Sequence, residues 1–410
     1  MHRDSIITQL YSLKSKADKM KNFITHIKTE FARIFSNPVV MLIFFAAPLL
    51  YGVLSANIYK KGKLTELPVV IIDEDHSAMS SKIIDALNDN ETIRVAKVQF
   101  EAGNIAAEMP SKEYIAVISI PENFESAILQ KKYPEILIDV NTANLVTANF
   151  ASRAIQTVLG TLNAGIEIES LKKGGMDDNT ARQRFEPFRA TYTRFYNPSG
   201  NYLELMFPGV LGTVMQQIIF LGLGLVFARD LEDGYFKKLA LKNKSAVYHI
   251  LLKGIPFTIL TSIVWLMVGC FFLFYKIDMP VFRKEMIVLV TVFSLACMFI
   301  AMLVSIIIPN QLKATEVLMV VATPSFLLSG YTWPLEGMPV LIQQIANMIP
   351  VTHFLQAFRK IGIYHGTLAD IYPQLKALSI MAVTCMVLLA LIIKIKIIKA
   401  NRKQNRLTAV

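Results

Sequence analysis

Seven long stretches without a charged residue dominate the pattern of hydrophobic and polar positions along this chain. Most of them reach the ~20 residues that an α-helix needs to cross a hydrocarbon core of about 30 Å. Because a backbone in lipid must satisfy its own hydrogen bonds, they predict membrane-spanning helices and not the buried helices of a soluble protein. They lie at residues 38–58, 205–228, 254–275, 286–312, 317–335, 337–358 and 377–393.

The composition agrees with this pattern. Of the 410 residues, 53% are hydrophobic, and the mean hydropathy is +0.45. The three cysteines, Cys270, Cys297 and Cys385, all lie within apolar stretches, so neither a disulfide framework nor a cysteine-based metal site is expected. The first stretch follows 37 residues with many charges, which is typical of a retained signal anchor and not of a cleaved secretory signal.

The distribution of lysine and arginine predicts the orientation in the membrane. Residues 1–37 contain seven, residues 229–253 contain six and the tail from residue 394 contains six, whereas residues 276–285 contain three and residues 336–372 contain two. The positive-inside rule therefore places both termini and the 229–253 loop in the cytoplasm. This scatter also argues against a nucleic-acid-binding surface, which would gather the basic residues in one patch.

Two cytoplasmic termini require an even number of spans, so one of the seven stretches does not cross. The stretch at 337–358 contains Pro339, Pro350, His353 and several amides, which are unfavourable in lipid and suit an interfacial or re-entrant element. Six spans are therefore predicted. They lie near residues 38–58, 203–228, 254–275, 286–308, 316–335 and 374–396.

The predicted fold is an α-helical polytopic membrane protein of about six spans, one before and five after an inserted α/β extracytoplasmic domain. The expected divisions are a cytoplasmic tail with an amphipathic helix (1–37), the first span (38–58), the outer domain (60–200), a five-span bundle (203–396) and a basic cytoplasmic tail (397–410). The bundle includes the cytoplasmic loop 229–253 and the outer re-entrant element 337–372.

The segment between the first two spans alternates strand-like and helical patterns, which favours a small sheet covered by helices. Strands are predicted at Leu67–Asp73 and at residues 92–100, 114–120 and 135–140, with an extended segment at 189–196. Helices are predicted at residues 77–87, 104–109, 122–130 and 142–171, and Gly174 and Gly175 end the last of these.

An acidic cluster at residues 73–77 follows the first strand, and two interpretations remain open for it. Asp73, Asp75 and His76 could bind a metal or act as acids and bases, or the cluster could be a polar turn whose Asp75 or Ser77 caps the next helix. The second interpretation is favoured, because no further His or Cys cluster lies in this segment to complete a metal site.

The chain lacks the motifs of several enzyme and ATPase classes. No GxSxG, HExxH or P-loop GxxxxGK[ST] sequence occurs, so a site for nucleotide phosphates is not expected on this chain. The central parts of the predicted spans also lack the ionisable residues that ion-coupled carriers use. If the chain moves a substrate, another subunit is expected to supply the energy.

Four segments carry motifs that resemble those of one family in the same order. Residues 26–44 (HIKTEFARIFSNPVVMLIF) form a basic amphipathic helix followed by Asn-Pro and a span. The other three are VVIIDEDHSAMSSKIIDAL at 69–87, NPSGNYLELMFPGVLG at 197–212 and FLLSGYTWPLEGMPVLIQQIANMIPVTHFLQAFRKI at 326–361. Together they resemble the membrane (permease) subunits of ABC exporters of the second type, in the branch with a large extracytoplasmic domain.

The resemblance assigns roles to particular residues. It implies an elbow helix with Lys28, Glu30 and Arg33, and an ATPase-coupling loop with Arg229, Asp230, Glu232 and Gly234. The loop departs from the family pattern at Tyr235, where threonine is usual, and at Lys242 and Asn243, where Thr-Pro is common. The outer re-entrant motif corresponds to Ser329, Gly330, Pro334, Met338, Pro339, Pro350, Thr352, Phe354 and Arg359.

The function that the resemblance implies is export of an amphipathic or hydrophobic, drug-like or lipid-like compound across the bacterial cytoplasmic (inner) membrane. The chain would have no catalytic site, metal or cofactor of its own. Its partners would be an ATP-binding subunit that holds ATP and Mg²⁺, a second permease copy or paralogue, and a periplasmic adaptor. Two alternatives are a membrane-anchored sensor or receptor and a membrane enzyme that uses the acidic cluster.

Overall fold

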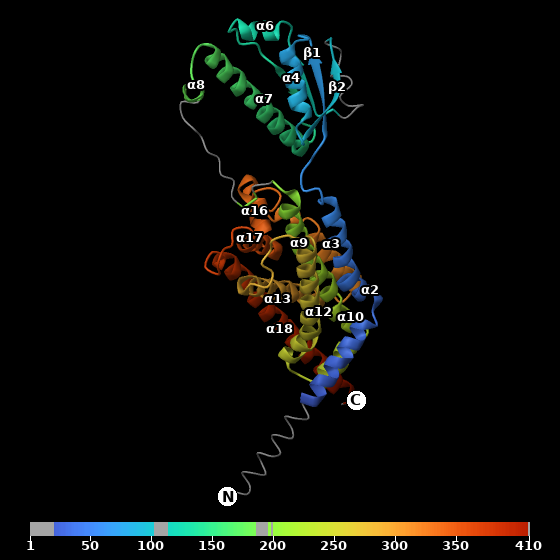
Figure 1. Cartoon of the computed structure of the whole chain (residues 1–410). Coiled ribbons are helices and arrows are strands. Elements are labelled where there is room, and N and C mark those ends of the chain that lie inside the picture. The colour runs from blue at the N-terminus through green and yellow to red at the C-terminus, as the bar shows by residue number, and fades with distance from the viewer. Residues whose placement is uncertain (1–19, 102–113, 186–195, 198–199, 409–410) are drawn as a thin grey trace. The chain divides into compact units, whose positions relative to one another are not determined.

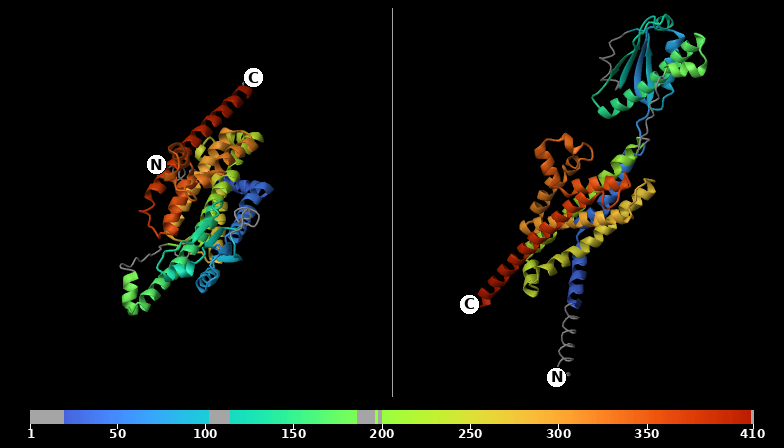
Figure 2. Two further views of the ribbon diagram at one scale, coloured as in Figure 1. Left: turned by 90° about the horizontal axis from the view of Figure 1, so that it is seen from above. Right: turned by 90° about the vertical axis from the view of Figure 1, so that its left-hand side faces the viewer.

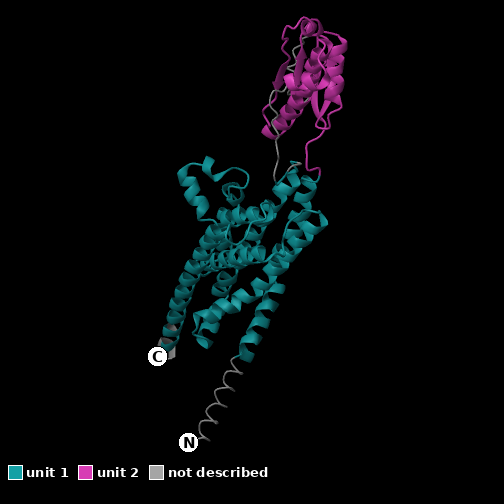
Figure 3. Cartoon of the chain, turned by 60° about the vertical axis from the view of Figure 1, so that its left-hand side comes forward, with its two compact units in different colours: residues 1–60, 196–410 teal, residues 61–195 magenta. Residues whose placement is uncertain are grey.

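The computed structural model describes residues 20–101, 114–185, 196–197 and 200–408. The chain forms two compact units (Figure 3). The helical unit comprises residues 1–60 and 196–410, and the mixed unit comprises residues 61–195. Each unit has its own hydrophobic core, and each is described by itself below.

The helical unit contains five helices that are long and apolar enough to cross a membrane, among the residues that the structure describes. The first (Pro38–Ile58) consists of α2 (Pro38–Met41), a π-helical turn (Leu42–Ala46) and α3 (Ala47–Ile58). Asn37 caps its start, because its side chain accepts hydrogen bonds from the amides of Val39 and Val40. The others are α9–α10 (Tyr202–Glu232), α12 (Ala246–Phe274), α13 (Lys284–Ile307) and the main part of α18 (Tyr372–Thr408).

Helix α9 (Tyr202–Gly224) is central in this unit (Figure 1). It contacts α3, α12, α13, α14 (Gln311–Ala322) and α17 (Pro350–Gly362). Of its apolar window, 78% is buried within the chain, whereas only 22% of the corresponding window of α18 is buried. Glycines allow the close approach of neighbours, since a Cβ atom on Gly222 would lie 2.3 Å from the ring of Phe44.

The predicted span at 316–335 is not one continuous helix, so the structure has five long apolar helices where the sequence predicts six spans. The chain forms α14 up to Ala322 and then the short α15 (Ser325–Leu328). Pro324 lies between them, and a proline has no amide hydrogen to continue a helix. The apolar character of this stretch, on which the predicted span was based, does not reveal the interruption.

The segment that follows contains only short helices, in line with the polar residues that set it apart in the sequence. A 3₁₀ turn (Leu335–Gly337) and α16 (Val340–Asn347) precede α17. Helix α17 packs against α9, α13 and α18, and one face of it is buried. With 13 residues, α17 is too short to cross a bilayer.

The mixed unit is a four-stranded sheet with the strand order β2-β1-β3-β4. Strand β1 (Leu67–Asp73) is parallel to β2 (Ile93–Gln99) and to β3 (Ala116–Ile120), and β4 (Leu137–Val140) is antiparallel to β3. The four predicted strands are thus confirmed, including the bounds of the first.

One face of this sheet packs against helices. Ile71 of β1 is buried in one core with Leu87 of α4 (Ala78–Asn88) and Ile155 of α7 (Leu145–Lys173). The remaining helices are α6 (Phe124–Leu129) and α8 (Asp178–Phe185). The predicted helix at 104–109 and nearly all of the extended segment at 189–196 lie outside the described residues.

Candidate functional site

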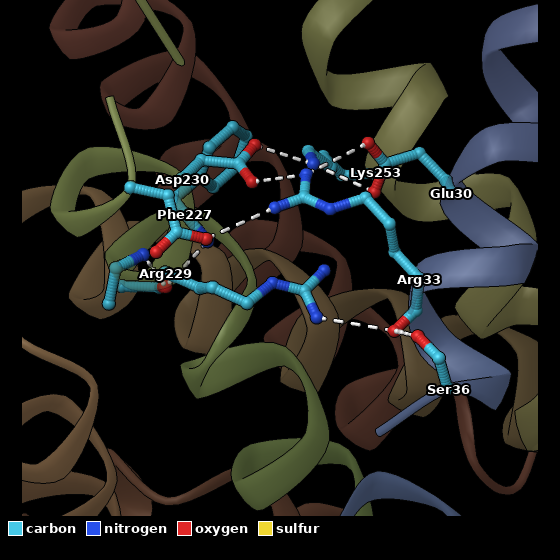
Figure 4. Close-up of polar contacts among 10 residues, drawn as sticks. Glu30, Arg33, Ser36, Phe227, Arg229, Asp230 and Lys253 are labelled. Carbon is cyan, nitrogen blue, oxygen red and sulfur yellow. Dashed lines mark hydrogen bonds and ion pairs between the residues drawn. The ribbon is translucent and has the colours of Figure 1, made fainter. Parts of the chain in front are cut away.

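A cluster of buried charges joins three segments of the helical unit (Figure 4). Glu30 comes from the helix at residues 20–35, here named the elbow helix. Asp230 comes from α10 (Val226–Glu232), and Lys253 lies near the start of α12. The side chains of these three residues are only 2%, 0% and 1% exposed, respectively. Buried charges of this kind require partners of opposite charge, and these three residues pair with one another.

Lys253 is held between the two carboxylates. Its Nζ atom lies 2.8 Å from Oε2 of Glu30 and 2.5 Å from Oδ2 of Asp230. Arg33 completes the cluster, with Nη1 2.7 Å from Oδ1 of Asp230 and 3.7 Å from Oε1 of Glu30. Two carboxylates and two cations therefore form a buried network, named here the charged junction (Glu30, Arg33, Asp230 and Lys253). Asp233 joins it from the surface, 3.5 Å from Nη2 of Arg33.

The local sequence explains how these groups meet. Glu30 and Arg33 are three residues apart, so they share one face of the elbow helix. Gly234, with a φ of +68°, turns the chain sharply from α10 into α11 (Tyr235–Lys242). This turn brings the ring of Tyr235 against the guanidinium of Arg33, whose Cζ atom lies 4.2 Å from the ring centroid. A planar cation on an aromatic face is a favourable contact.

Arg33 and Tyr235 both have a raised pKa in these surroundings. Burial acts to lower the pKa of Arg33, but the Asp230 carboxylate and then Glu30 oppose it, and the pKa is raised from its usual value. Burial, followed by the charge of Glu30, raises the pKa of Tyr235. The guanidinium therefore stays protonated and the phenol stays neutral.

The four residues that the family resemblance assigned to the coupling loop have different surroundings. Asp230 is in the junction, whereas Arg229 donates from Nη1 to the carbonyl oxygen of Arg33 at 3.3 Å. Glu232 accepts a hydrogen bond from the amide of Gln311 at 2.9 Å and another from its side chain, which links α10 to the start of α14. Gly234 provides the turn.

On the elbow helix the structure distinguishes between the assigned residues. Glu30 and Arg33 are in the junction, but Lys28 is exposed and contributes nothing to it. The sequence missed Lys253, which was counted as the end of the 229–253 loop, although it lies two turns inside α12. The sequence signal for a buried Lys253 was its position as a single charge directly before the apolar stretch 254–275.

A break in the second long helix lies next to the junction. Leu225 separates α9 from α10, and Ser305 of α13 accepts hydrogen bonds there from the amides of Phe227 and Ala228, both at 2.9 Å. The Ser305 side chain is fully buried. One hydroxyl oxygen thus holds the start of α10, the helix that carries Asp230, against α13.

Replacing Ser305 by alanine is expected to destabilise the protein by about 1–3 kcal/mol, because two buried amides lose their acceptor. Thermal unfolding of the purified protein in detergent measures the effect. Ser294 on the same helix is a matched control, since its buried hydroxyl has no hydrogen-bond partner in the part of the chain that the structure describes. Equal melting temperatures for the two alanine variants would contradict this role.

The motif at 329–359 gathers around Tyr331, three residues after the end of α15. The Tyr331 hydroxyl donates to the carbonyl oxygen of Leu205 at 2.6 Å, and Arg359 donates from Nη2 to the carbonyl oxygen of Tyr331 at 2.8 Å. The Arg359 guanidinium also stacks on the Tyr331 ring, 4.5 Å from its centroid. Arg359 thus connects α17 to the chain after α15, and the sequence did not identify Tyr331 as its partner.

The other residues of this motif have structural roles. Ser329 accepts from the amide of Tyr331 at 3.2 Å, and Gly330 adopts a φ of +78° that favours glycine. Thr352 is buried in α17, where Phe354 stacks on Phe293 of α13 with ring centroids 4.1 Å apart. Pro334 and Pro339 precede the 3₁₀ turn and α16, Met338 accepts from Gln343, and Pro350 opens α17.

The acidic cluster at residues 73–77 is a turn that caps α4. Oδ1 of Asp73 accepts from the amides of Asp75 and His76, and Oδ2 accepts from the hydroxyl of Ser80 at 2.8 Å. Ser77 and Ser80 form a capping box. Within the described residues, no group of three or more His, Cys, Asp or Glu side chains is placed to hold a metal. The turn therefore accounts for Asp73 and Ser77.

Comparison with known proteins identifies relatives over most of the chain. Residues 38–392 match the family described as "ABC-2 family transporter protein". The chain is 26% identical to the "Probable multidrug ABC transporter permease YbhS" of Escherichia coli K12 over 79% of this chain and 81% of that protein. It is 24% identical to the "Inner membrane transport permease YhhJ" of the same organism, over 81% of this chain and 86% of that protein.

Proposed function

The chain belongs to the ABC-2 transporter family, and on that premise we propose that it is the permease subunit of an ATP-driven exporter. It would form the transmembrane pathway as a dimer, with a second copy or a paralogue, and would depend on a separate ATP-binding subunit. The match over residues 38–392 supports the family role, because it covers four of the five long apolar helices of the described residues in full and most of the fifth. ATP hydrolysis would belong to the partner and not to this chain.

We further propose the orientation and span count that the basic residues indicate. Both termini and the α10–α11 segment would be cytoplasmic, in a bacterial inner membrane. The interrupted pair α14–α15 would supply the sixth crossing, since broken helices are tolerated in membranes where protein surrounds the break. The mixed unit would then be extracytoplasmic, and α16 and α17 would lie at the outer surface.

The charged junction is the observation that carries the coupling proposal. It joins the elbow helix to α10 and α12 through buried ion pairs, so these segments resist separation. A displacement that the ATP-binding subunit imposes on α10 and α11 would move α12 and the elbow helix with them. The junction would in this way pass the movement of the ATPase to the helices of the pathway.

The substrate class rests on the relatives and on the apolar character of the spans. The relative YbhS carries the name of a probable multidrug permease, and a further relative, YbhR of Escherichia coli K12, 19% identical to this chain, carries the same description. We propose an amphipathic or hydrophobic substrate, drug-like or lipid-like. A periplasmic adaptor would be a further partner of the mixed unit.

Co-purification tests the pairing with an ATPase. The tagged chain is expressed with each P-loop ATPase of the same organism, extracted in detergent and purified. One ATPase is expected to remain bound, and a disulfide between a cysteine at exposed Lys238 of α11 and a cysteine on that ATPase is expected to form. A cysteine at exposed Lys173 of the mixed unit is the control and should not cross-link. The absence of any bound ATPase would contradict the proposal.

A further inference from the structure

The C-terminal end of α18 carries a group of cations directly after its apolar part. The helix runs unbroken from Tyr372 to Thr408, and residues 377–393 contain no charge. Lys394, Lys396, Lys399 and Arg402 follow within a length of about 12 Å, given the rise of 1.5 Å per residue in an α-helix. Figure 2 shows α18 as one long red helix that ends at the C-terminus. The cations therefore lie where this helix would leave the hydrocarbon core.

The face of α18 that carries these cations is turned away from the rest of the helical unit. Its inner face is buried at Leu389, Ile393 and Ile397. The outer face is an exposed apolar row at intervals of three or four residues, which is the spacing of one helix face. The row consists of Ile380, Val383, Val387, Leu391, Ile395 and Ile398.

The cations continue this exposed row. Lys394 is three residues from Leu391, and Arg402 is four residues from Ile398, so both lie on the same face. Lys394, Lys399 and Arg402 are exposed, and Lys396 is half-buried. An exposed apolar row thus ends in positive charges.

Within the described residues, no acidic side chain forms an ion pair with the cations at this end of the helix. Residues 371–410 contain no aspartate or glutamate. Among the described residues, none of the four cations takes part in an ion pair, in contrast to Lys253 of the charged junction. Helix α11, which contacts α18, adds Lys237, Lys238 and Lys242 and no acid.

We propose that the C-terminal end of α18 binds the headgroups of anionic phospholipids through Lys394, Lys396, Lys399 and Arg402. Anionic lipid complements the charge, and the exposed Ile395 and Ile398 beside the cations complement the acyl chains. An acidic protein surface would match the charge alone and leave these isoleucines without apolar contacts. The bound lipid would fix the depth and tilt of α18, which packs along α13 and α17.

Spin-labelled lipids test this site on the full-length chain in vesicles of phosphatidylcholine with about a third of phosphatidylglycerol. The electron paramagnetic resonance spectrum separates lipids immobilised at the protein from free ones. The wild-type chain is expected to prefer labelled phosphatidylglycerol over phosphatidylcholine several-fold, and the preference should fall as salt is raised. Substitution of all four cations by glutamine should reduce the ratio toward one.

Two further variants make the outcome unambiguous. Four exposed cations of the mixed unit, Lys82, Arg94, Lys132 and Lys173, are replaced by glutamine as the matched control and should leave the preference unchanged. The pair K399Q/R402Q keeps the first two lysines for correct insertion. It should reduce the preference ratio to about its square root, since each cation near the surface adds a similar free energy of attraction. A wild-type preference in the α18 variants would overturn the proposal.

Co-purification of the same glutamine variants with the ATPase subunit, done separately from the spin-label assay, distinguishes a protein partner from lipid. If the glutamine variants keep their lipid preference but no longer bind the ATPase subunit, the surface docks a protein and the lipid proposal is wrong. The spin-label assay contains no ATP, ATPase or substrate. A negative result in it therefore leaves the proposed export function unaffected. Conversely, a reconstituted complex that shows no export would not change the lipid preference expected in the spin-label assay.

Discussion

Replacement of Lys253 by methionine is expected to destabilise the helical unit by about 3–5 kcal/mol, the usual effect of removing one partner from a buried ion pair. The substitution keeps the length of the side chain but removes its charge. Glu30 would lose its contact at 2.8 Å and keep only the longer one to Arg33 at 3.7 Å. Asp230 would retain Arg33 on one oxygen alone.

The loss is measured as a lower midpoint of thermal unfolding in detergent and as a lower rate of export. Lys82→Met is the matched control, because Lys82 is exposed on α4 of the mixed unit, and it should behave as the wild type does. Adding Glu30→Gln to the Lys253→Met variant removes one of the uncompensated carboxylates, so the double variant should be more stable than Lys253→Met alone. A wild-type midpoint for Lys253→Met would contradict the role of the junction.

Gly209→Val is expected to have the second large effect, since it forces a side chain into a space that the Tyr331 ring occupies. A Cβ atom at Gly209 would lie 2.3 Å from Cε1 and 2.5 Å from Cδ1 of Tyr331. The ring cannot easily move away, because its hydroxyl binds the carbonyl of Leu205 and its face contacts Arg359. Overpacking of this kind costs about 1–3 kcal/mol, and here the outer turn after α15 would also separate from α9.

Gly165→Val supplies the control for this prediction. Gly165 is also inside a helix, α7 of the mixed unit, but a Cβ atom there would meet nothing within 4 Å. Its unfolding midpoint should not fall, whereas that of Gly209→Val should. If Gly209→Val melts like the wild type, the ring has room to turn aside. If Gly209→Val does lower the unfolding midpoint, adding Tyr331→Ala should restore part of the lost stability.

The sequence predicted most elements whose signal is local. Strand β1 was predicted to its exact residues, because the apolar run Leu67–Asp73 is bounded by polar residues on both sides. Five long helices also matched apolar stretches. The remaining predicted span, residues 316–335, does not form one helix, because Pro324 interrupts it. A hydropathy average over the whole stretch does not reveal the effect of one proline.

The candidate site was predictable only in part, because its contacts link distant segments. The resemblance to the family identified Glu30, Arg33 and Asp230, but nothing in the sequence indicates that Glu30 and Asp230 share a lysine across 200 positions. Lys253 was counted with the loop charges that orient the chain. Arg359 was identified, but its partner Tyr331 lies 28 residues away in a segment read as a span.

ATP-driven transport by the reconstituted complex shows whether this chain is the permease of an exporter. The chain and its co-purified ATPase are placed in vesicles, and the movement of a fluorescent hydrophobic cation is followed after ATP is added. Transport is expected to require ATP and the permease, and to fall with Lys253→Met but not with Lys82→Met. ATP hydrolysis without any ATP-dependent movement of drug-like or lipid-like compounds, in the wild-type complex, would contradict the proposed export function.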